Sequence, residues 1–377
     1  DGSFEAGERL MTLSVSVLGA GAGGLSISAD LSRAGHRVTL FEAARFKENL
    51  EPIRKQGGVL LIEGDAQGEV VPLAGVTADP GRAVRGAEVV IIVVPCFGHE
   101  WFAKTFVPRL NRDQIVVFIG EGGGALVFHS VRKKLGKGKG IIVGETNTLP
   151  YSARITGPGA ANIRVKKRGG VIAAALPASE NTNLLSAVHA LYPNIRPATN
   201  VLETVLVNFN AIDHVATVLA NAGHLESRTT NMLLWGEGAT TSVARCIDTV
   251  DNEILAIRGA LGFKDRTPYR HWLFEQGFLA KKRRTTYEAI HASALASSRY
   301  PCGPEALKTR YVTEDVPYSL VLISSIARVA GVDVPLIDGL IAMASAMNGV
   351  DYRAKGRTLE KLGVRAKGPR ELLAAVG

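Results

Sequence analysis

A glycine-rich turn near the start of the chain constrains the fold more than any other feature. Residues 14–43 read SVSVLGAGAGGLSISADLSRAGHRVTLFEA. The apolar runs on either side of the glycines predict a strand, a tight turn, a helix and a second strand. This order is typical of a βαβ unit that binds a dinucleotide. The glycines of the turn are Gly19, Gly21, Gly23 and Gly24.

Each glycine of the G-x-G-x-x-G spacing has a physical role in such a unit. Gly19 allows the sharp turn out of the strand, and Gly21 lets the backbone approach a pyrophosphate closely. Gly24 lets the following helix pack against the sheet, and Gly23 lies in the same turn. The amides at the start of that helix then face the phosphates. We therefore predict a site for NAD or NADP here; the alternative is a structural turn that binds nothing.

The end of the second strand bears on the choice of dinucleotide. Glu42 lies about 20 residues after the glycines, where a carboxylate binds the ribose diol of NAD and repels the 2′-phosphate of NADP. Arg45 follows in the same segment and could instead bind such a phosphate. The sequence slightly favours NAD and leaves NADP open.

The length of 377 residues exceeds what one hydrophobic core usually serves, so we expect two domains. Alternating strands and helices predict a Rossmann domain with a doubly wound, mainly parallel sheet over residues 11–199. The apolar period then becomes helical, which predicts an all-helical C-terminal domain over residues 200–377. The active site is expected in the cleft between the two. Residues 1–10 read as an N-terminal extension or an expression remnant, with Met11 a plausible native start.

The same patterns predict individual elements. The runs at residues 87–94 and 114–119 are apolar and β-branched, as is typical of strands that are buried on both faces. Further strands are expected at residues 59–62, 70–73, 140–144, 171–176 and 195–198, with a helix over 181–191. In the second domain we expect no strands, a helix that ends at Gly223, and helices over residues 319–330 and 336–347.

Composition argues against several other classes of protein. The chain has a net charge of +9, with 46% hydrophobic and 21% charged residues. Its basic runs, residues 166–168 and 281–284, are not interleaved with aromatic residues, so they indicate solvated surface rather than a nucleic-acid site. No apolar run is long enough to span a membrane. Three separated cysteines predict neither a zinc site nor a disulfide framework, and they favour the cytoplasm.

Several segments together resemble the NAD(P)-dependent opine dehydrogenases, the octopine/nopaline dehydrogenase family. In the first domain they are VPCFGHEWF at residues 94–102, GEGGGALVF at 120–128 and ETNTLPYSARITGPG at 145–159. In the second domain they are DHVATVLANAGHLES at 213–227 and RYVTEDVPYSLV at 310–321. The resemblance implies NAD(P)H-dependent reductive condensation of a 2-oxo acid, such as pyruvate, with the amine of an amino acid, and the reverse reaction.

The resemblance places the catalytic residues in the second domain. His214 takes the place of the family's catalytic histidine, although Val215 follows it where a proline is usual. An imidazole, with a pKa of about 6.5, suits the proton transfers of imine formation and hydrolysis. Asp315 would hold the other ring nitrogen, and Arg310 would clamp a carboxylate with its planar fork. Each residue also has a structural alternative. His214 could be a hydrogen-bonded histidine on a helix face, Asp315 a helix cap, and Arg310 part of a surface ion pair.

Further site residues are expected at the carboxyl ends of strands in the first domain, where doubly wound sheets bind ligands. Thr148 and Tyr151 are predicted to contact the substrate, and Pro95 and His99 to lie at the nicotinamide end of the cofactor. For His99 a structural role is an equal alternative. No histidine spacing indicates a metal site. The expected partners are small molecules, with neither nucleic acid nor membrane, and the chain could form a homodimer.

Two other functions stay open at this point. One is a different oxidoreductase of the 6-phosphogluconate-dehydrogenase-like superfamily, acting on a 2-hydroxy acid or an alcohol. The other is a dinucleotide-binding protein without turnover. The combination of His214, Arg310 and Asp315 argues against this second alternative, because a sensor needs none of the three.

Overall fold

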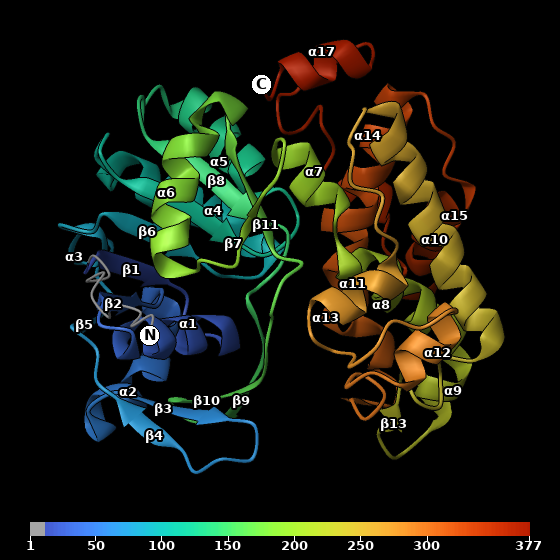
Figure 1. Ribbon diagram of the computed structural model, residues 1–377, viewed down its shortest axis with the longest axis horizontal. Coiled ribbons are helices and arrows are strands. Elements are labelled where there is room, and N and C mark those ends of the chain that lie inside the picture. The colour runs from blue at the N-terminus through green and yellow to red at the C-terminus, as the bar shows by residue number, and fades with distance from the viewer. Residues whose placement is uncertain (1–11) are drawn as a thin grey trace, which may run out of the picture.

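The computed structural model describes residues 12–377, so the expectations for residues 1–10 and Met11 lie outside the described part of the chain. The N-terminal part holds nearly all of the strands, and the C-terminal part is mainly helical. The two parts lie side by side (Figure 1). This arrangement confirms the predicted fold class, a Rossmann-type α/β domain followed by a helical domain.

The central sheet of the first part has eight strands. From one edge to the other they are β12 (Arg196–Pro197), β11 (Ile172–Leu176), β8 (Ile142–Thr146), β7 (Ile115–Ile119), β6 (Val89–Ile92), β1 (Ser14–Leu18), β2 (Arg37–Phe41) and β5 (Gly75–Thr77). All neighbouring pairs are parallel except β11 and β8, which are antiparallel. All residues of β6 are buried, as expected for a strand that is covered on both faces.

Helices cover both faces of this sheet. They are α1 (Ala22–Arg33), α2 (Glu51–Gln56), α3 (Pro80–Val84), α4 (His99–Phe106), α5 (Gly124–Leu135) and α6 (Asn181–Leu191). Successive side chains of a strand point to opposite faces, so Val17 lies in one hydrophobic core and its neighbour Leu18 in the other. The core with Val17 includes α1 and α6, and the core with Leu18 includes α3, α4 and α5.

A second sheet departs from the prediction. Its strands, in spatial order, are β4 (Glu69–Val71), β3 (Val59–Glu63), β10 (Ala160–Lys166) and β9 (Tyr151–Gly157). The segments expected at residues 59–62 and 70–73 are indeed strands, but they pair with each other and with β10 rather than with the central sheet. The loop between β3 and β4 is too short for a parallel crossover, which needs a dozen or more residues, so the two strands form an antiparallel hairpin.

The second part is built from helices. They are α7 (Val201–Leu206), α8 (Phe209–Ala220), α9 (Ala222–Ser227), α10 (Thr241–Ala260), α11 (Tyr269–Glu275), α12 (Thr286–His291), α13 (Arg310–Thr313), α14 (Val321–Ala330), α15 (Pro335–Asn348), α16 (Tyr352–Lys355) and α17 (Pro369–Ala374), with a small ribbon of β13 (Met232–Leu233) and β14 (Arg299–Tyr300). No helix among residues 12–377 combines the length and the apolar character needed to cross a membrane.

Three local details differ from the expectations. Gly223 does not end a helix but lies inside α9, because α8 already ends at the preceding cap residue Asn221. The β13–β14 ribbon contradicts the expected absence of strands, and its two-residue strands are too short to leave a periodic pattern in the sequence. A π-helical turn, Asp315–Leu320, precedes α14, which therefore begins at Val321 rather than at Ser319.

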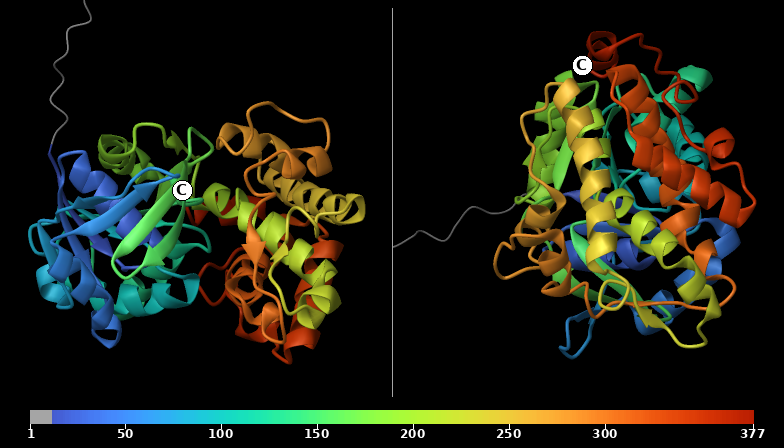
Figure 2. Two further views of the ribbon diagram at one scale, coloured as in Figure 1. Left: turned by 90° about the horizontal axis from the view of Figure 1, so that it is seen from below. Right: turned by 90° about the vertical axis from the view of Figure 1, so that its right-hand side faces the viewer.

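The two parts are joined by a continuous hydrophobic core. The core beneath α4 and α5 extends into α8, α10 and α14 of the second part. Helix α17 lies at the upper end of the boundary between the parts in Figure 1, and the amide of Ala178 donates to the carbonyl of Val376 at 2.9 Å. Figure 2 shows the same two-part arrangement from two other sides. We propose that the boundary between the two domains lies between residues 199 and 200.

Candidate active site

The first glycine turn lies between β1 and α1, and the surrounding backbone requires two of its glycines, Gly19 and Gly24. At Gly19 the backbone φ is +115°, and an added Cβ would lie 2.7 Å from the carbonyl oxygen of Val93. At Gly24 an added Cβ would lie 1.7 Å from the carbonyl oxygen of Gly19. At Gly23 it would lie 2.6 Å from the side chain of Leu149. The tight turn and the close helix packing of a dinucleotide-binding unit are therefore present.

Gly21 is different, because nothing in the protein requires a glycine there. Its φ is −79°, and an added Cβ would meet no atom within 4 Å. It immediately precedes α1, whose first amides have no partners within the helix. A pyrophosphate at the start of this helix would need the space beside Gly21, so the turn fits a dinucleotide.

Glu42 follows β2 beside this turn and is buried. Its carboxylate accepts hydrogen bonds from the amides of Ala20, at 3.0 Å, and Ala43, at 2.7 Å. Glu42 therefore holds the glycine turn against the end of β2, a role separate from any contact with a ribose. Arg45 is exposed, and its guanidinium lies 5.8 Å from the ring centroid of Trp101.

A second glycine turn follows β7 and carries Glu121. At Gly122 the φ is +86°, and an added Cβ would lie 2.6 Å from Sγ of Cys96, which follows Pro95 in the turn after β6. The buried Arg357 donates to the carbonyl oxygens of Gly122 and Cys96 and so joins the two turns. Local sequence patterns do not reveal this role of Arg357, because its partners lie more than two hundred positions away in the chain.

The structure brings His214 and Asp315 together. His214 lies on α8, and its Nδ1 is 2.7 Å from Oδ2 of Asp315, the first residue of the π turn. The ring of Tyr311 stacks on the imidazole, with centroids 3.7 Å apart and planes at 9°. The other ring nitrogen, Nε2, is 3.9 Å from Oδ1 of Asp213, too far for a hydrogen bond. The imidazole is thus held in orientation with Nε2 available to a substrate.

Burial sets the protonation of this pair. It lowers the pKa of His214, while the nearby carboxylates of Asp213 and Glu121 oppose that shift. Burial also raises the pKa of Asp315, and the charge of Glu314 raises it further. The imidazole is therefore neutral near pH 7, the form that can accept a proton.

Glu121 is a site residue that the sequence analysis did not identify. Its Oε1 accepts a hydrogen bond at 2.8 Å from Nδ2 of Asn210, which precedes His214 by one turn on α8. Burial raises the pKa of Glu121 well above its usual value, and the charges of Asp315 and Glu314 raise it further. A protonated Glu121 can donate a hydrogen bond. Its position within the glycine run of residues 120–124 is the only sequence signal that it offers.

Arg310 lies at the edge of the site, with 63% of its side chain exposed. Its Nε donates to Oε2 of the buried Glu314, and Oε1 of Glu314 accepts the amide of Cys96 at 2.7 Å. Glu314 therefore ties Arg310 to the turn after β6 and leaves the two terminal nitrogens of the guanidinium for another acceptor. The i,i+4 spacing of Arg310 and Glu314 was a sequence signal for this pair.

Thr148 lies after β8, and its hydroxyl accepts a hydrogen bond from Nζ of Lys167 at 2.8 Å. Burial lowers the pKa of Lys167 to about 7, while Glu121 opposes the shift. The basic run of residues 166–168 predicts a solvated surface position for Lys167, and the structure corrects that prediction. Lys167 is half-buried while its two neighbours are exposed, because it follows directly on β10, where alternate side chains face opposite sides.

Two other predicted residues lie in the interior, and the structure does not bring them to the His214 pair. The hydroxyl of Tyr151 donates to Asp30 at 2.5 Å and lies 3.1 Å from the hydroxyl of Tyr192. His99 is 4% exposed, with its ring 5.1 Å from that of Phe118. Burial lowers the pKa of His99 well below its usual value, so it is a neutral core residue. Both contacts indicate packing roles.

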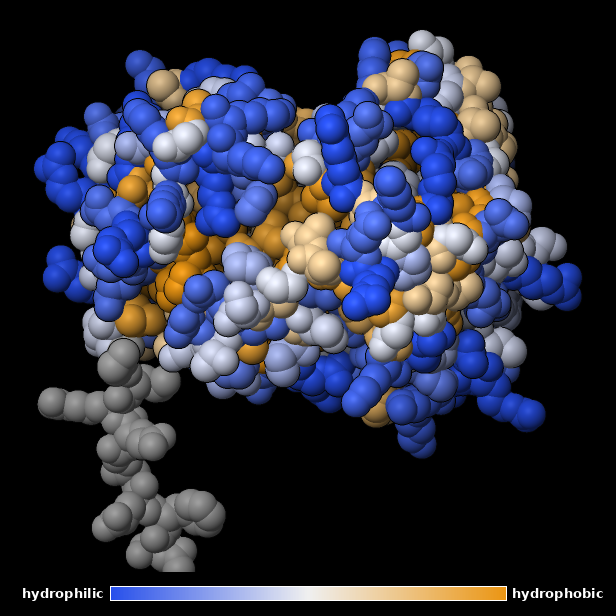
Figure 3. All heavy atoms as spheres, turned by 90° about the horizontal axis from the view of Figure 1, so that it is seen from above, coloured by the Kyte–Doolittle hydropathy of each residue, from blue (hydrophilic) through white to orange (hydrophobic). Residues whose placement is uncertain are grey.

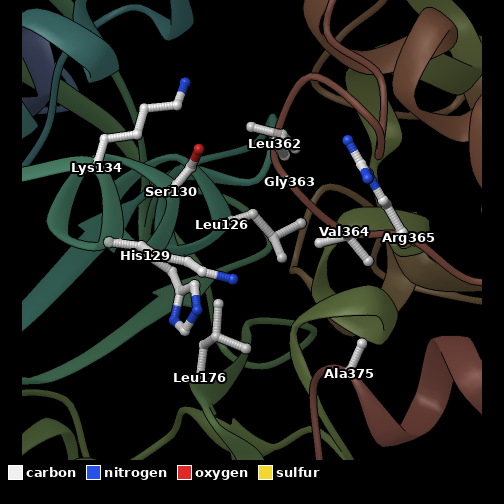
Figure 4. A pocket seen from close by; sticks show the side chains of 11 residues that line it. Leu126, His129, Ser130, Lys134, Leu176, Leu362, Gly363, Val364, Arg365 and Ala375 are labelled. Atoms are coloured by element: carbon white, nitrogen blue, oxygen red, sulfur yellow. The ribbon is translucent and has the colours of Figure 1, made fainter.

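A pocket of about 600 Å³ lies between α5 and the C-terminal segment. Apolar side chains such as Leu126, Leu176 and Val364 line it, with Lys134 beside them (Figure 4). From above, apolar surface is visible in the hollow between the two parts of the molecule (Figure 3). None of the predicted site residues lines this pocket, so its size does not mark the catalytic site.

Known proteins agree with this geometry. The family model for the NAD/NADP octopine/nopaline dehydrogenase, alpha-helical domain, matches residues 197–348, and the model for ketopantoate reductase PanE/ApbA matches residues 15–168. An opine dehydrogenase from Arthrobacter sp. (strain 1C) is 32% identical, over 92% of this chain and 94% of that protein.

Solved structures share the fold. A structure of octopine dehydrogenase in complex with NADH and agmatine has a TM-score of 0.76 at 21% identity, covering 97% of this chain and 98% of its own. A structure of NADP⁺-bound yersinopine dehydrogenase has a TM-score of 0.67 at 15% identity, covering 97% and 98%. At these identities the likeness establishes the arrangement of both parts, including the helical second part.

The fold and the comparisons define an NAD(P)-dependent oxidoreductase that acts on a CH–NH bond. The chain belongs to the opine dehydrogenase family. Its reaction class is therefore the reductive condensation of a 2-oxo acid with the amine of an amino acid.

Proposed function

We propose that the enzyme joins pyruvate, as the first candidate 2-oxo acid, to the amine of an amino acid and reduces the resulting imine to a secondary amine. The observation that carries this proposal is the His214–Asp315 pair, which is held by a 2.7 Å hydrogen bond and a stacked Tyr311 ring. The product carries carboxylates from both substrates. The reverse reaction, oxidation of this product, uses the same groups.

His214 moves the protons of this reaction. As the amine nitrogen attacks the keto carbon, the nitrogen loses a proton, which the neutral imidazole accepts at Nε2. The imidazolium returns that proton to the former keto oxygen, which makes the carbinolamine. A second proton, taken up from solvent through the same imidazole, lets the hydroxyl leave as water, and the protonated imine that remains becomes the neutral secondary amine when it gains a hydride. NAD(P)H, when bound at the first glycine turn, would supply the hydride that reduces the imine carbon. Asp315 holds Nδ1 throughout and stabilises the imidazolium.

Two side chains hold the 2-oxo acid in this proposal. Neither terminal guanidinium nitrogen of Arg310 has a hydrogen-bond partner among residues 12–377, and the two nitrogens match the two oxygens of a carboxylate. The hydroxyl of Thr148 accepts from Lys167, so its own proton remains to be donated to a substrate oxygen. Lys167 is thus a positioning residue for Thr148, and its burial keeps the hydroxyl in one orientation.

We propose that the enzyme prefers NAD over NADP, because the carboxylate of Glu42 beside the first glycine turn repels a 2′-phosphate. Arg45, stacked near Trp101, is the reason that NADP remains the second candidate. We further propose a cytoplasmic location, which suits three free cysteines, and a homodimer. Competition between NADH and NADPH in a binding titration tests the first point, and light scattering tests the last.

The decisive assay is oxidation of NADH with pyruvate, measured with and without an added amino acid. We expect rapid loss of NADH only when both substrates are present. Full turnover with pyruvate alone would instead indicate a 2-hydroxy acid dehydrogenase. Binding of NADH with no turnover on any substrate panel would indicate a protein that only senses the dinucleotide.

A further inference from the structure

A second pocket, of about 370 Å³, lies between the β9–β10 hairpin and a loop of the helical part. Its lining is more polar than apolar. The residues that line it are Arg154 and Ile155 from β9, Arg164 from β10, and Ser297, Ser298 and Arg299 from the helical part.

The three arginines of this pocket carry positive charge without a matching carboxylate. Arg154, Arg164 and Arg299 are exposed, and none of them forms an ion pair with any residue in the range 12–377. Arg154 donates to the carbonyl oxygen of its neighbour Ala153 at 3.0 Å, which leaves most of its guanidinium free. Three like charges around one pocket repel one another and attract an anion.

The pocket is connected to the catalytic group through Arg154. After burial, the charge of Arg154 contributes to the lowered pKa of His214. Burial raises the pKa of Tyr311 to about 12, and Arg154 is the first group that opposes this shift. A packing contact links the pocket to the same rings: Arg299 precedes Tyr300 in β14, and the ring of Tyr300 lies 5.3 Å, centroid to centroid, from the ring of Tyr311 that stacks on His214.

We propose that this tri-arginine pocket binds a second acidic group on the amino donor, so that the preferred amine is a dicarboxylic amino acid such as glutamate or aspartate. The proposal rests on the reaction proposed above. In this proposal the amine lies near Nε2 of His214, and the side chain of the donor extends toward Arg154 and the pocket that it lines. The planar forks of Arg154, Arg164 and Arg299 suit bidentate contacts to a carboxylate.

The amino donor, rather than the 2-oxo acid, supplies this group. The keto carbon must lie against the nicotinamide, and the glycine turns that hold the cofactor belong to the central sheet. The pocket instead lies on the separate four-stranded sheet and on the loop that contains Ser297 and Arg299. A group that reaches it therefore extends from the nitrogen side of the new C–N bond.

The test compares matched pairs of amines in the NADH oxidation assay with pyruvate. Glutamate and glutamine have nearly the same shape and differ in one charge, as do aspartate and asparagine. We expect kcat/KM to be at least about tenfold higher for the acid of each pair, the worth of one charge-assisted contact. The preference should weaken as salt is raised, because the arginines are exposed.

Variants then locate the effect. Arg154→Gln, Arg164→Gln and Arg299→Gln should each raise the KM for glutamate and leave the KM for glutamine and for pyruvate unchanged. Arg283→Gln, in the exposed basic run outside the pocket, is the matched control and should change none of them. Arg154→Gln should also raise the pKa of His214, because it removes a nearby positive charge.

Two results would overturn the inference, and they are distinguishable. Equal kcat/KM for glutamate and glutamine would reject the acidic donor while leaving opine formation intact. Absence of turnover with every amine would reject the proposed function and this inference with it. An acid preference that survives all three arginine variants would place the charge recognition elsewhere and would also reject the pocket.

Discussion

The two glycine turns of this enzyme follow strands β1 and β7 of one sheet, yet they have opposite designs. The turn at residues 19–24 is crowded at its other glycines but leaves free space at Gly21, where an added Cβ would meet no protein atom within 4 Å. The turn at residues 120–124 is crowded, since an added Cβ at Gly122 would lie 2.6 Å from Cys96. The first turn offers backbone amides to a ligand, whereas the second places the ionisable Glu121 beside the catalytic pair.

This difference separates binding from chemistry. The first turn is made by one local segment and contains no ionisable side chain. Its affinity for the cofactor should therefore depend little on whether His214 is protonated. The catalytic cluster combines segments from both domains and depends on buried charges that oppose one another. Changes in one region should therefore leave the other nearly untouched.

The largest effect is expected at Gly21. Gly21→Leu should abolish NADH binding, because the new side chain fills the space that a pyrophosphate needs. The protein should remain folded, since no protein atom lies within 4 Å of the added Cβ. A fluorescence titration with NADH and a thermal melt measure the two outcomes. Gly24→Ala is the contrasting variant: its Cβ would overlap the carbonyl of Gly19, so it should lower the melting temperature.

The next effect tests the other region. His214→Ala should lower the rate of opine formation by about 10²–10⁴-fold, the usual contribution of a positioned proton-transfer group. The Kd for NADH should stay within about twofold, because the residue lies in the helical part. A variant that loses NADH affinity as strongly as it loses rate would show that the two regions are not independent.

A smaller effect, on pH dependence, should distinguish the partners of the catalytic pair. Burial lowers the pKa of His214, so opine oxidation, which needs the neutral imidazole, should rise as pH approaches that pKa from below and then level off. Asp315→Asn removes a negative charge that stabilises the imidazolium, so the pH profile should move to lower pH. Each pH unit of that shift corresponds to an about tenfold weaker binding of the proton by His214. An unshifted profile would show that Asp315 is already neutral in the pair.

The smallest effect is expected at the edge of the site. Arg310→Lys keeps the charge but loses the two-pronged contact, so the KM for pyruvate should rise by about tenfold. The kcat should change little, since Arg310 moves no proton. Steady-state kinetics at saturating amine measures both values. An unchanged KM would show that another cation binds the carboxylate, and Lys167, which donates to Thr148, is the next candidate to test.

The same contrast explains how much could be predicted from the sequence. The first glycine turn and the strands of the central sheet depend on neighbouring residues, so local patterns were sufficient. The separate sheet of β3, β4, β9 and β10 was not predicted, because strand patterns do not reveal which sheet a strand joins. His214 and Asp315 were identified through family resemblance, and their contact agrees with it.

The missed residues share one property. Glu121, Lys167 and Arg357 owe their roles to partners that are remote in the chain, namely Asn210, Thr148 and the turn after β6. An acidic residue in a glycine run and a lysine in a basic run look like solvated surface in a sequence. Burial, which only the assembled fold determines, changes their pKa values and gives them a place in the site.

The most direct test of the account is the identity and stoichiometry of the product. The enzyme is incubated with pyruvate, an amino acid and NADH, and the mixture is analysed by mass spectrometry while NADH loss is followed by absorbance. The account predicts one secondary-amine dicarboxylate formed for each NADH consumed, at wild-type rate only with His214 intact. Lactate formed in step with NADH loss, with no condensed product, would contradict it.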